Sequence, residues 1–262
     1  MVAGLSPPLL ITESAESPPK GRTCIHVVCS PQAHVGTTLT SRLLIDFLIS
    51  RSTGAVGFDT NHLDPQLASI FPREVRTIDL SSTRDQMTLF DSLIEDDNIA
   101  KVVDLWHVSF DRFFKQAEDI GLFEEMRSRN LKCFVLLQMD PKGRFTGELS
   151  RLRKRCAGAD VILVENEWLA GLHEESGSST TFAVDRRRLF VPKLNSAAYY
   201  LLQQPEIMAC RFVHMRVPSE LQALQDQLRG SLLPFFRQLE ILETAIELGI
   251  SAEALLSRKH SS

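Results

Sequence analysis

The sequence lacks several features that would place the protein in a simple functional class. Positive charge is not in excess, because 29 Lys and Arg residues stand against 33 Asp and Glu residues, a formal net charge of -4. A basic field over the whole molecule is therefore excluded, and any contact with nucleic acid must be local. No apolar run approaches the roughly 20 residues of a membrane-spanning helix. Residues 1–8 lack the basic start of a secretory signal, so we expect a cytoplasmic protein.

Cysteine and histidine are few and scattered. The five cysteines include no CxxC pair, and three of them stand in strongly apolar runs, so we expect buried free thiols in a reducing compartment. The seven histidines show no spacing typical of a structural metal site. What is present is ordinary for a soluble globular protein: 262 residues, 44% hydrophobic and 24% charged. This length fits one α/β domain with a small appendage.

Short apolar runs alternate with segments of helical periodicity along most of the chain. The runs are apolar throughout, as strands buried on both faces require. Strands that alternate with helices are typical of a parallel sheet, so we predict an α/β fold: a mainly parallel sheet of about seven strands with helices on both faces. The predicted strands cover residues 24–29, 55–59, 75–80, 101–106, 133–137, 160–164 and 188–191, and the predicted helices include 37–50, 87–94, 109–128 and 146–156.

Composition divides the chain into three regions. Residues 1–22 hold four of the 12 prolines and no periodicity, which predicts a flexible tail. Residues 23–203 contain the predicted α/β domain, and a polar loop is expected at 174–181. Residues 204–262 are predicted to form a C-terminal helical extension packed on that domain.

The extension is expected to contain two helices, the second of them amphipathic. Pro218 opens the first helix, Gly230 interrupts it, and Pro234 opens the second. The acidic face of the second helix does not suit an anionic membrane. Its apolar stripe either packs on the chain's own sheet or forms an interface with a second copy or a partner protein. The stripe consists of Phe235, Phe236, Leu239, Leu242 and Ile246.

The loop after the first predicted strand, residues 31–38, stands where nucleotide-binding α/β proteins hold a phosphate against a helix N-terminus. Set against the phosphate-loop motif G-x-x-x-x-G-K-[ST], only Gly36 and Thr38 match. Pro31 stands in the place of the first glycine, and Thr37 in the place of the phosphate-binding lysine.

The order of the segments around this loop resembles the ParA/MinD family of deviant Walker ATPases. Residues 32–39 are similar to the family loop K-G-G-V-G-K-T-T. This sequence keeps the V-G of the loop and a following threonine, but both lysines are replaced. The resemblance spans residues 24 to about 203. Its other segments are Phe58-Asp59-Thr60-Asn61 with Asp64-Pro65-Gln66, Lys101-Val102-Val103-Asp104-Leu105, Val164-Glu165-Asn166 and Val191-Pro192-Lys193. Phe90-Asp91-Ser92-Leu93-Ile94 and Ser109-Phe110 resemble ParA-like proteins of conjugation and mobilisation clusters.

The resemblance implies roles for individual residues, with ATP and Mg²⁺ as cofactors. Asp59 would approach the catalytic water, and Thr38 and Asp104 would hold Mg²⁺. Family members dimerise face to face across their nucleotides, and the lysine that crosses to the partner is replaced here by Gln32. The nucleotide would contact Gln32, Ala33, His34, Val35, Gly36, Thr37, Thr38 and, at the adenine, Asn166.

The missing lysines bear directly on this chemistry. Catalysis of phosphoryl transfer is largely positioning and charge stabilisation, so their loss removes a main contribution. We expect weak ATP binding at best, hydrolysis near background and poor control of association by ATP. Lys20 or Arg42 are the nearby residues that could supply a charge instead. The competing interpretation is that the loop is an ordinary strand-to-helix turn, and that Asp59 and Asp104 merely cap the turns that follow their strands.

Two basic clusters remain. Arg151, Arg153, Lys154 and Arg155 lie on a predicted helix and either contact DNA nonspecifically or form a solvated helix face; Arg186, Arg187 and Arg188 precede the last strand. Trp106 and His107 follow the fourth strand and either shape the site or, for Trp106, pack in the core.

Three functions follow from the resemblance. The first is a protein that partitions, positions or transfers DNA or a cellular complex, as a homodimer or with a protein partner and with impaired ATP hydrolysis. The alternative is a non-hydrolysing pseudo-ATPase that acts as a scaffold or regulator. A small-molecule ligase of the dethiobiotin synthetase type ranks last, because it depends still more on an intact phosphate loop.

Overall fold

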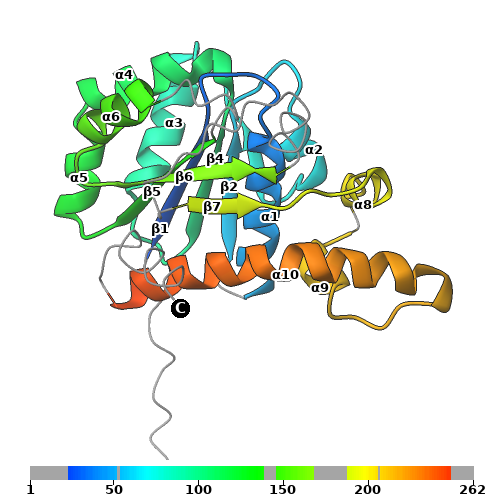
Figure 1. Cartoon of the computed structure of the whole chain (residues 1–262). Helices are drawn as coiled ribbons and strands as arrows, with labels where there is room; N and C mark the ends of the chain where they lie inside the picture. The colour runs from blue at the N-terminus through cyan, green and yellow to red at the C-terminus, as the bar shows by residue number, and fades with distance from the viewer. Residues whose placement is uncertain (1–22, 52–53, 139–145, 168–187, 206, 249–262) are drawn as a thin grey trace, which may run out of the picture.

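The computed structural model describes residues 23–51, 54–138, 146–167, 188–205 and 207–248 (Figure 1). The predicted tail at 1–22, the polar loop at 174–181, Lys20, Arg186 and Arg187 lie outside these residues.

The described chain is built on a sheet of seven parallel strands in the order β3-β2-β4-β1-β5-β6-β7. This confirms the predicted fold class. The third strand is shorter than expected, because only three residues pair with β2 at the edge of the sheet. The strands are β1 Cys24–Cys29, β2 Ala55–Asp59, β3 Val75–Thr77, β4 Ala100–Leu105, β5 Lys132–Gln138, β6 Asp160–Asn166 and β7 Arg188–Val191.

Helices cover both faces of the sheet (Figure 1). One face packs against α1, α2, α8, α9 and α10, and the other against α3, α4, α5 and α6. Their bounds are α1 Thr37–Ser50, α2 Gln66–Ile70, α3 Thr83–Ile94, η1 His107–Ser109, α4 Phe110–Asp119, α5 Leu122–Ser128, α6 Thr146–Arg155, α8 Ser196–Leu202, α9 Ala209–Phe212 and α10 Ser219–Leu248.

Three predicted helix boundaries were wrong. The helix expected over 87–94 begins at Thr83, where the side chain of Ser82 caps it by accepting from the backbone N–H of Asp85. The helix expected over 109–128 is divided between α4 and α5, because Gly121 takes a left-handed conformation with φ of 65° between them. Conversely, α10 runs without interruption through Gly230 and Pro234. A proline removes one helical hydrogen bond and crowds the carbonyl of the residue four before it, here Gly230. Buried apolar residues on both sides of Pro234 hold the helix in one piece against the domain.

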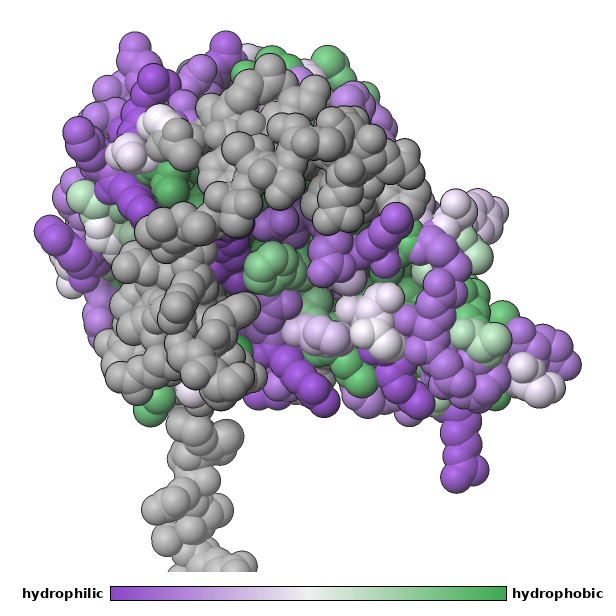
Figure 2. All heavy atoms as spheres, in the orientation of Figure 1, coloured by the Kyte–Doolittle hydropathy of each residue, from purple (hydrophilic) through white to green (hydrophobic). Residues whose placement is uncertain are grey.

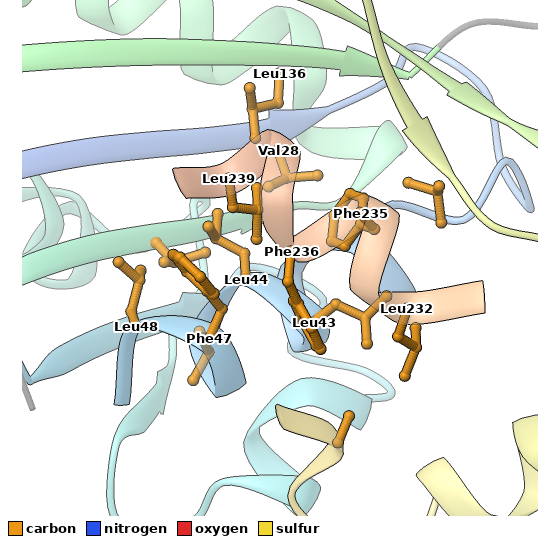
Figure 3. Packing of buried hydrophobic residues seen from close by; sticks show 14 of the residues in the cluster. Val28, Leu43, Leu44, Phe47, Leu48, Leu136, Leu232, Phe235, Phe236 and Leu239 are labelled. Atoms are coloured by element: carbon orange, nitrogen blue, oxygen red, sulfur yellow. The ribbon is translucent and has the colours of Figure 1, made fainter. Parts of the chain in front are cut away.

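The apolar stripe of α10 belongs to the core of the chain itself (Figure 3). Phe235, Phe236, Leu239 and Leu242 are all at most 4% exposed. Phe236 stacks on Phe47 of α1, with ring centroids 6.0 Å apart. Of the two uses considered for the stripe, packing on the chain's own domain is therefore the one that the structure shows; the side chain of Ile246 lies outside the description. The described part of the extension shares the core of the α/β domain.

The drawn surface exposes few apolar residues, as expected when the apolar stripe of α10 is buried. On the face drawn in Figure 2, the described residues are mostly hydrophilic, and apolar residues form small separate patches. Four of the five cysteines are buried and Cys210 is half-buried. Among the described helices, none combines the length and the apolar character needed to cross a membrane.

Candidate ligand pocket at the carboxyl edge of the sheet

The order of the strands creates a crevice at the carboxyl ends of β1 and β4. From β1 the chain crosses to β2 through α1 on one face, and from β4 it crosses to β5 through α4 and α5 on the other face. Neighbouring strands whose connections leave in opposite directions open a crevice beyond their ends, which is where such sheets bind ligands. The predicted loop follows β1, and Asp104 lies near the end of β4.

The loop turns into α1 at Gly36, as predicted. Gly36 is the residue before the helix and has a φ of 100°, which favours glycine. A Cβ added there would lie 2.4 Å from Nδ2 of Asn166. Nδ2 of Asn166 donates to the carbonyl oxygen of Val35 at 3.2 Å, so the end of β6 holds the loop directly. His34 also has a positive φ, of 60°, without being a glycine.

Two buried carboxylates stand side by side below the loop. Asp59 and Asp104 are register partners on β2 and β4, strands that lie about 4.8 Å apart. They are 1% and 5% exposed. Ser41 donates to Oδ1 of Asp104 at 3.0 Å, and the side chain of Thr38 also hydrogen-bonds this carboxylate. The structure thus brings together Thr38, Asp59 and Asp104, as the sequence predicted.

Burial and mutual repulsion shift the ionisation of both carboxylates. Burial, and then the neighbouring Asp59 charge, raise the pKa of Asp104 to about 7, against the lowering effect of hydrogen bonds from Thr38 and Ser41. Burial likewise raises the pKa of Asp59, opposed by three backbone N–H groups. The pair therefore favours any ligand that brings positive charge.

Asp59 caps the next helix. Its Oδ1 accepts from the backbone N–H of Asn61 at 3.0 Å, and its Oδ2 accepts from Leu67 and Ala68 at 2.9 and 3.3 Å. One oxygen is thus bound by the turn after β2 and the other by the first turn of α2. The capping interpretation of Asp59 is what the geometry shows, while its proposed catalytic role stays a prediction.

The pocket above these carboxylates measures about 730 Å³. Of the predicted site residues, Gln32, Ala33, His34, Gly36, Thr37, Thr38, Asp59, Asp104 and Asn166 line it, and Val35 does not. Its described lining contains Asp59, Asp64 and Asp104 but no lysine or arginine. The pocket is large enough for a nucleotide or another small molecule.

Arg42 does not replace the missing lysine. Its side chain is 1% exposed, and its Nη2 donates to the carbonyl oxygens of Gln204 and Ile207 at 3.3 and 3.1 Å. Four residues further along α1, Asp46 accepts from the backbone N–H groups of Ala209 and Cys210. These two charged residues therefore fasten α1 to the segment around α9 and leave Arg42 out of the pocket lining.

Thr38 and Asp104 fit Mg²⁺ only in part. Their side chains meet, as a hydroxyl and a carboxylate on one ion would require. Over the described residues, no group of three or more His, Cys, Asp or Glu could hold a metal ion. Mg²⁺ would need further ligand oxygens, for example from a bound phosphate.

The sequence analysis missed two tyrosines that line the pocket and two residues, Ser41 and Gln138, that do not line it but hydrogen-bond residues of the site and its loop. Ser41 lies one turn after Thr38 on α1, so helical spacing could have identified it. Gln138 ends β5, and its Nε2 donates to Oγ1 of Thr40 beneath the loop. Tyr199 and Tyr200 come from α8, and nothing in their sequence context indicated that this helix reaches the pocket. Trp106 and His107 also line it, which agrees with a role in shaping the site.

The basic cluster on α6 is partly neutralised. Arg151 pairs with Glu148 at 3.1 Å, and Arg155 pairs with Glu118 at 3.3 Å and lies over the ring of Phe114. These pairs are those of a solvated helix face. Contact with DNA through Arg151, Arg153, Lys154 and Arg155 remains a prediction.

Comparison with known proteins shows only remote likeness. No family model and no curated protein match the chain. A nucleotide-binding protein from Archaeoglobus fulgidus, solved in complex with ADP, is 12% identical, with a TM-score of 0.39 over 71% of this chain and 89% of that chain. A plasmid partition protein from Borrelia burgdorferi is 11% identical, with a TM-score of 0.38 over 64% of this chain and 89% of that chain. At these scores neither likeness supports an argument about function.

Proposed function

We propose that this chain is a ParA/MinD-like protein whose nucleotide site has lost hydrolysis, and that it acts as a cytoplasmic scaffold or regulator through protein–protein contacts. One observation carries the proposal: the described lining of the pocket contains three aspartates and no lysine or arginine. A triphosphate entering this pocket would meet charge of its own sign.

Hydrolysis needs stabilisation of the charge that develops on the transferred phosphoryl group. Thr37 and Gln32 stand where the family has lysines, and neither side chain carries a charge. Asp59, the candidate for approaching the attacking water, accepts from three backbone N–H groups, one in the turn after β2 and two in the first turn of α2. Both the cationic and the water-positioning requirements are therefore unmet by these residues.

Weak nucleotide binding is still expected. The N-terminus of α1 carries the partial positive charge of a helix end, about half a unit charge, close to the loop. Thr38 and Asp104 retain the contact that a Mg²⁺–nucleotide complex would use. These features support the second candidate, a partition or positioning protein that still responds to ATP as a dimer or with a partner.

Calorimetric titration of ATP with Mg²⁺ tests the proposal, using the wild type and Thr37→Lys. If the loop retains a phosphate cradle, the restored charge should tighten ATP binding by roughly 1–3 kcal/mol. Thr88→Lys is the matched control, because Thr88 is exposed on α3 and does not line the pocket. Tight ATP binding by the wild type would contradict the proposal, and equal binding by all three proteins would mean that the loop is an ordinary turn.

A further inference from the structure

The chemistry of the pocket lining suits a ligand of the opposite charge to a nucleotide. We propose that this pocket binds an organic cation, a guanidinium or ammonium group, in the space between its carboxylates and its aromatic wall. The inference rests on the proposed loss of phosphate recognition and names what the pocket recognises instead.

The floor and rim of the pocket carry the negative charge. Asp104 and Asp59 form the buried floor, and Asp64 is exposed and lines the same pocket. Opposite charges attract more strongly near a protein surface, where the effective dielectric constant is about 20, than in bulk water. The opposing partial charge of the α1 N-terminus is only about half a unit, so the carboxylates dominate.

Arg42, the described basic residue that the sequence suggested as a substitute for the lysine, is engaged elsewhere. Arg42 shares its electrostatic environment with Asp46 and Tyr199, and its Nη2 is bound to two backbone carbonyls. It lies outside the described lining, so it does not supply a cation to the floor. Thr38 and Ser41 stabilise Asp104 through hydroxyl groups, which leave its charge uncompensated.

The wall of the pocket supplies aromatic faces. Trp106, Tyr199 and Tyr200 all line it, and the faces of aromatic rings attract guanidinium and ammonium groups. Trp106 is fixed in place: its backbone N–H donates to Oγ1 of Thr60 at 2.7 Å, and its ring meets those of His62 and His107 edge to face. Aromatic rings and carboxylates that line one pocket suit an organic cation better than a hydrated metal ion.

Titration of Trp106 fluorescence tests this inference directly. The sequence holds two tryptophans, so Trp168→Phe leaves Trp106 as the only reporter. The probes are N-acetylarginine amide, here called arginine amide, and N-acetylcitrulline amide, here called citrulline amide, which has the same shape and an uncharged side chain; both are titrated at one pH and ionic strength. We expect arginine amide to bind at least roughly tenfold more tightly than citrulline amide, since charge-assisted contacts distinguish the two.

Asp104→Asn and Asp64→Asn should each weaken the binding of arginine amide, whereas Asp226→Asn should leave it unchanged. Asp226 is exposed on α10, pairs with Arg229 and does not line the pocket. Equal affinity for the two amides, or tighter binding of Mg²⁺ that displaces arginine amide, would overturn the inference. That result would leave the proposed function intact, because weak ATP binding and the loss of hydrolysis are measured separately.

Two further probes identify the source of the cation. A peptide with one internal arginine that binds much more tightly than arginine amide would support a partner protein that inserts a basic side chain. Tighter binding of spermidine would support a free polyamine. Either result upholds the inference, and failure of all three cations to bind refutes it.

Discussion

Replacing Asp104 by Asn should stabilise the protein near pH 8 while leaving it little changed near pH 4. Asp104 is buried beside Asp59, and its pKa is raised from 3.8 to about 7. One pKa unit corresponds to about 1.36 kcal/mol, so keeping this carboxylate ionised in the folded protein costs up to about 4 kcal/mol above pH 7. Asparagine has nearly the same shape and keeps an acceptor for Ser41 without ionising.

The sign follows from linkage between protonation and folding. The folded-state pKa of Asp104 lies above its unfolded value, so its contribution to stability is complete below about pH 4 and is lost as the pH rises through about 7. The difference in unfolding free energy between Asp104→Asn and wild type should therefore grow from near zero at about pH 4 to roughly 2–4 kcal/mol at about pH 8. Other ionisable groups are common to both proteins and cancel in this difference.

Urea denaturation followed by circular dichroism, in the presence of EDTA and at several pH values, measures this difference. Asp226→Asn removes an exposed aspartate and should show no such trend. A stability difference that stays constant with pH, or a variant that is less stable than wild type near pH 8, would refute the argument that the floor of the pocket lacks a compensating cation.

Three further predictions concern the scaffold around the pocket. Gly36→Ala should destabilise the protein by roughly 1–3 kcal/mol, because the added Cβ would collide with the side chain of Asn166. The cost should be smaller in an Asn166→Ala background, and an equal cost in both backgrounds of this double-mutant cycle would contradict the clash. His26 is buried, which lowers its pKa to about 4, so its contribution to stability is complete above about pH 6.5 and is lost as the pH falls. Relative to His26→Phe, the free energy of unfolding of the wild type should therefore fall by roughly 3 kcal/mol by about pH 4, as measured by urea titration. Leu239→Glu should unfold the domain, because Leu239 is buried, while Leu248→Glu, at a site 63% exposed, should leave the melting temperature unchanged. A Leu239→Glu protein that stays folded and changes its sedimentation coefficient would contradict the placement of the stripe in the core.

The sheet could be predicted from the sequence because its strands are buried on both faces. Runs such as Cys24–Cys29 and Ala100–Leu105 are rich in apolar residues and alternate with helical segments, which leaves few arrangements other than a parallel sheet. Both strands are buried along their whole length. The boundaries of α10 were mispredicted for a physical reason. Gly230 and Pro234 are helix breakers by local propensity, but the buried residues around them stabilise a continuous helix through tertiary packing.

The floor of the pocket was predictable, whereas its wall was not. Asp59 and Asp104 end neighbouring parallel strands, so the carboxyl edge of the sheet had to bring them together. Tyr199 and Tyr200 reach the pocket from α8, whose position depends on how the chain returns after β7. The sequence allowed two interpretations of Asp59, catalysis and capping, since a carboxylate at the end of a strand can do either. The structure shows that it caps α2.

The central claim, that the site has lost hydrolysis, is tested most directly by steady-state phosphate release from ATP with Mg²⁺. The wild type should remain at the background rate of an Asp104→Asn protein, because no described lysine or arginine lines the pocket to stabilise the transferred phosphoryl group. Turnover by the wild type that Asp104→Asn abolishes, at a rate of about 1 per second or above as in ordinary enzymes, would contradict the account.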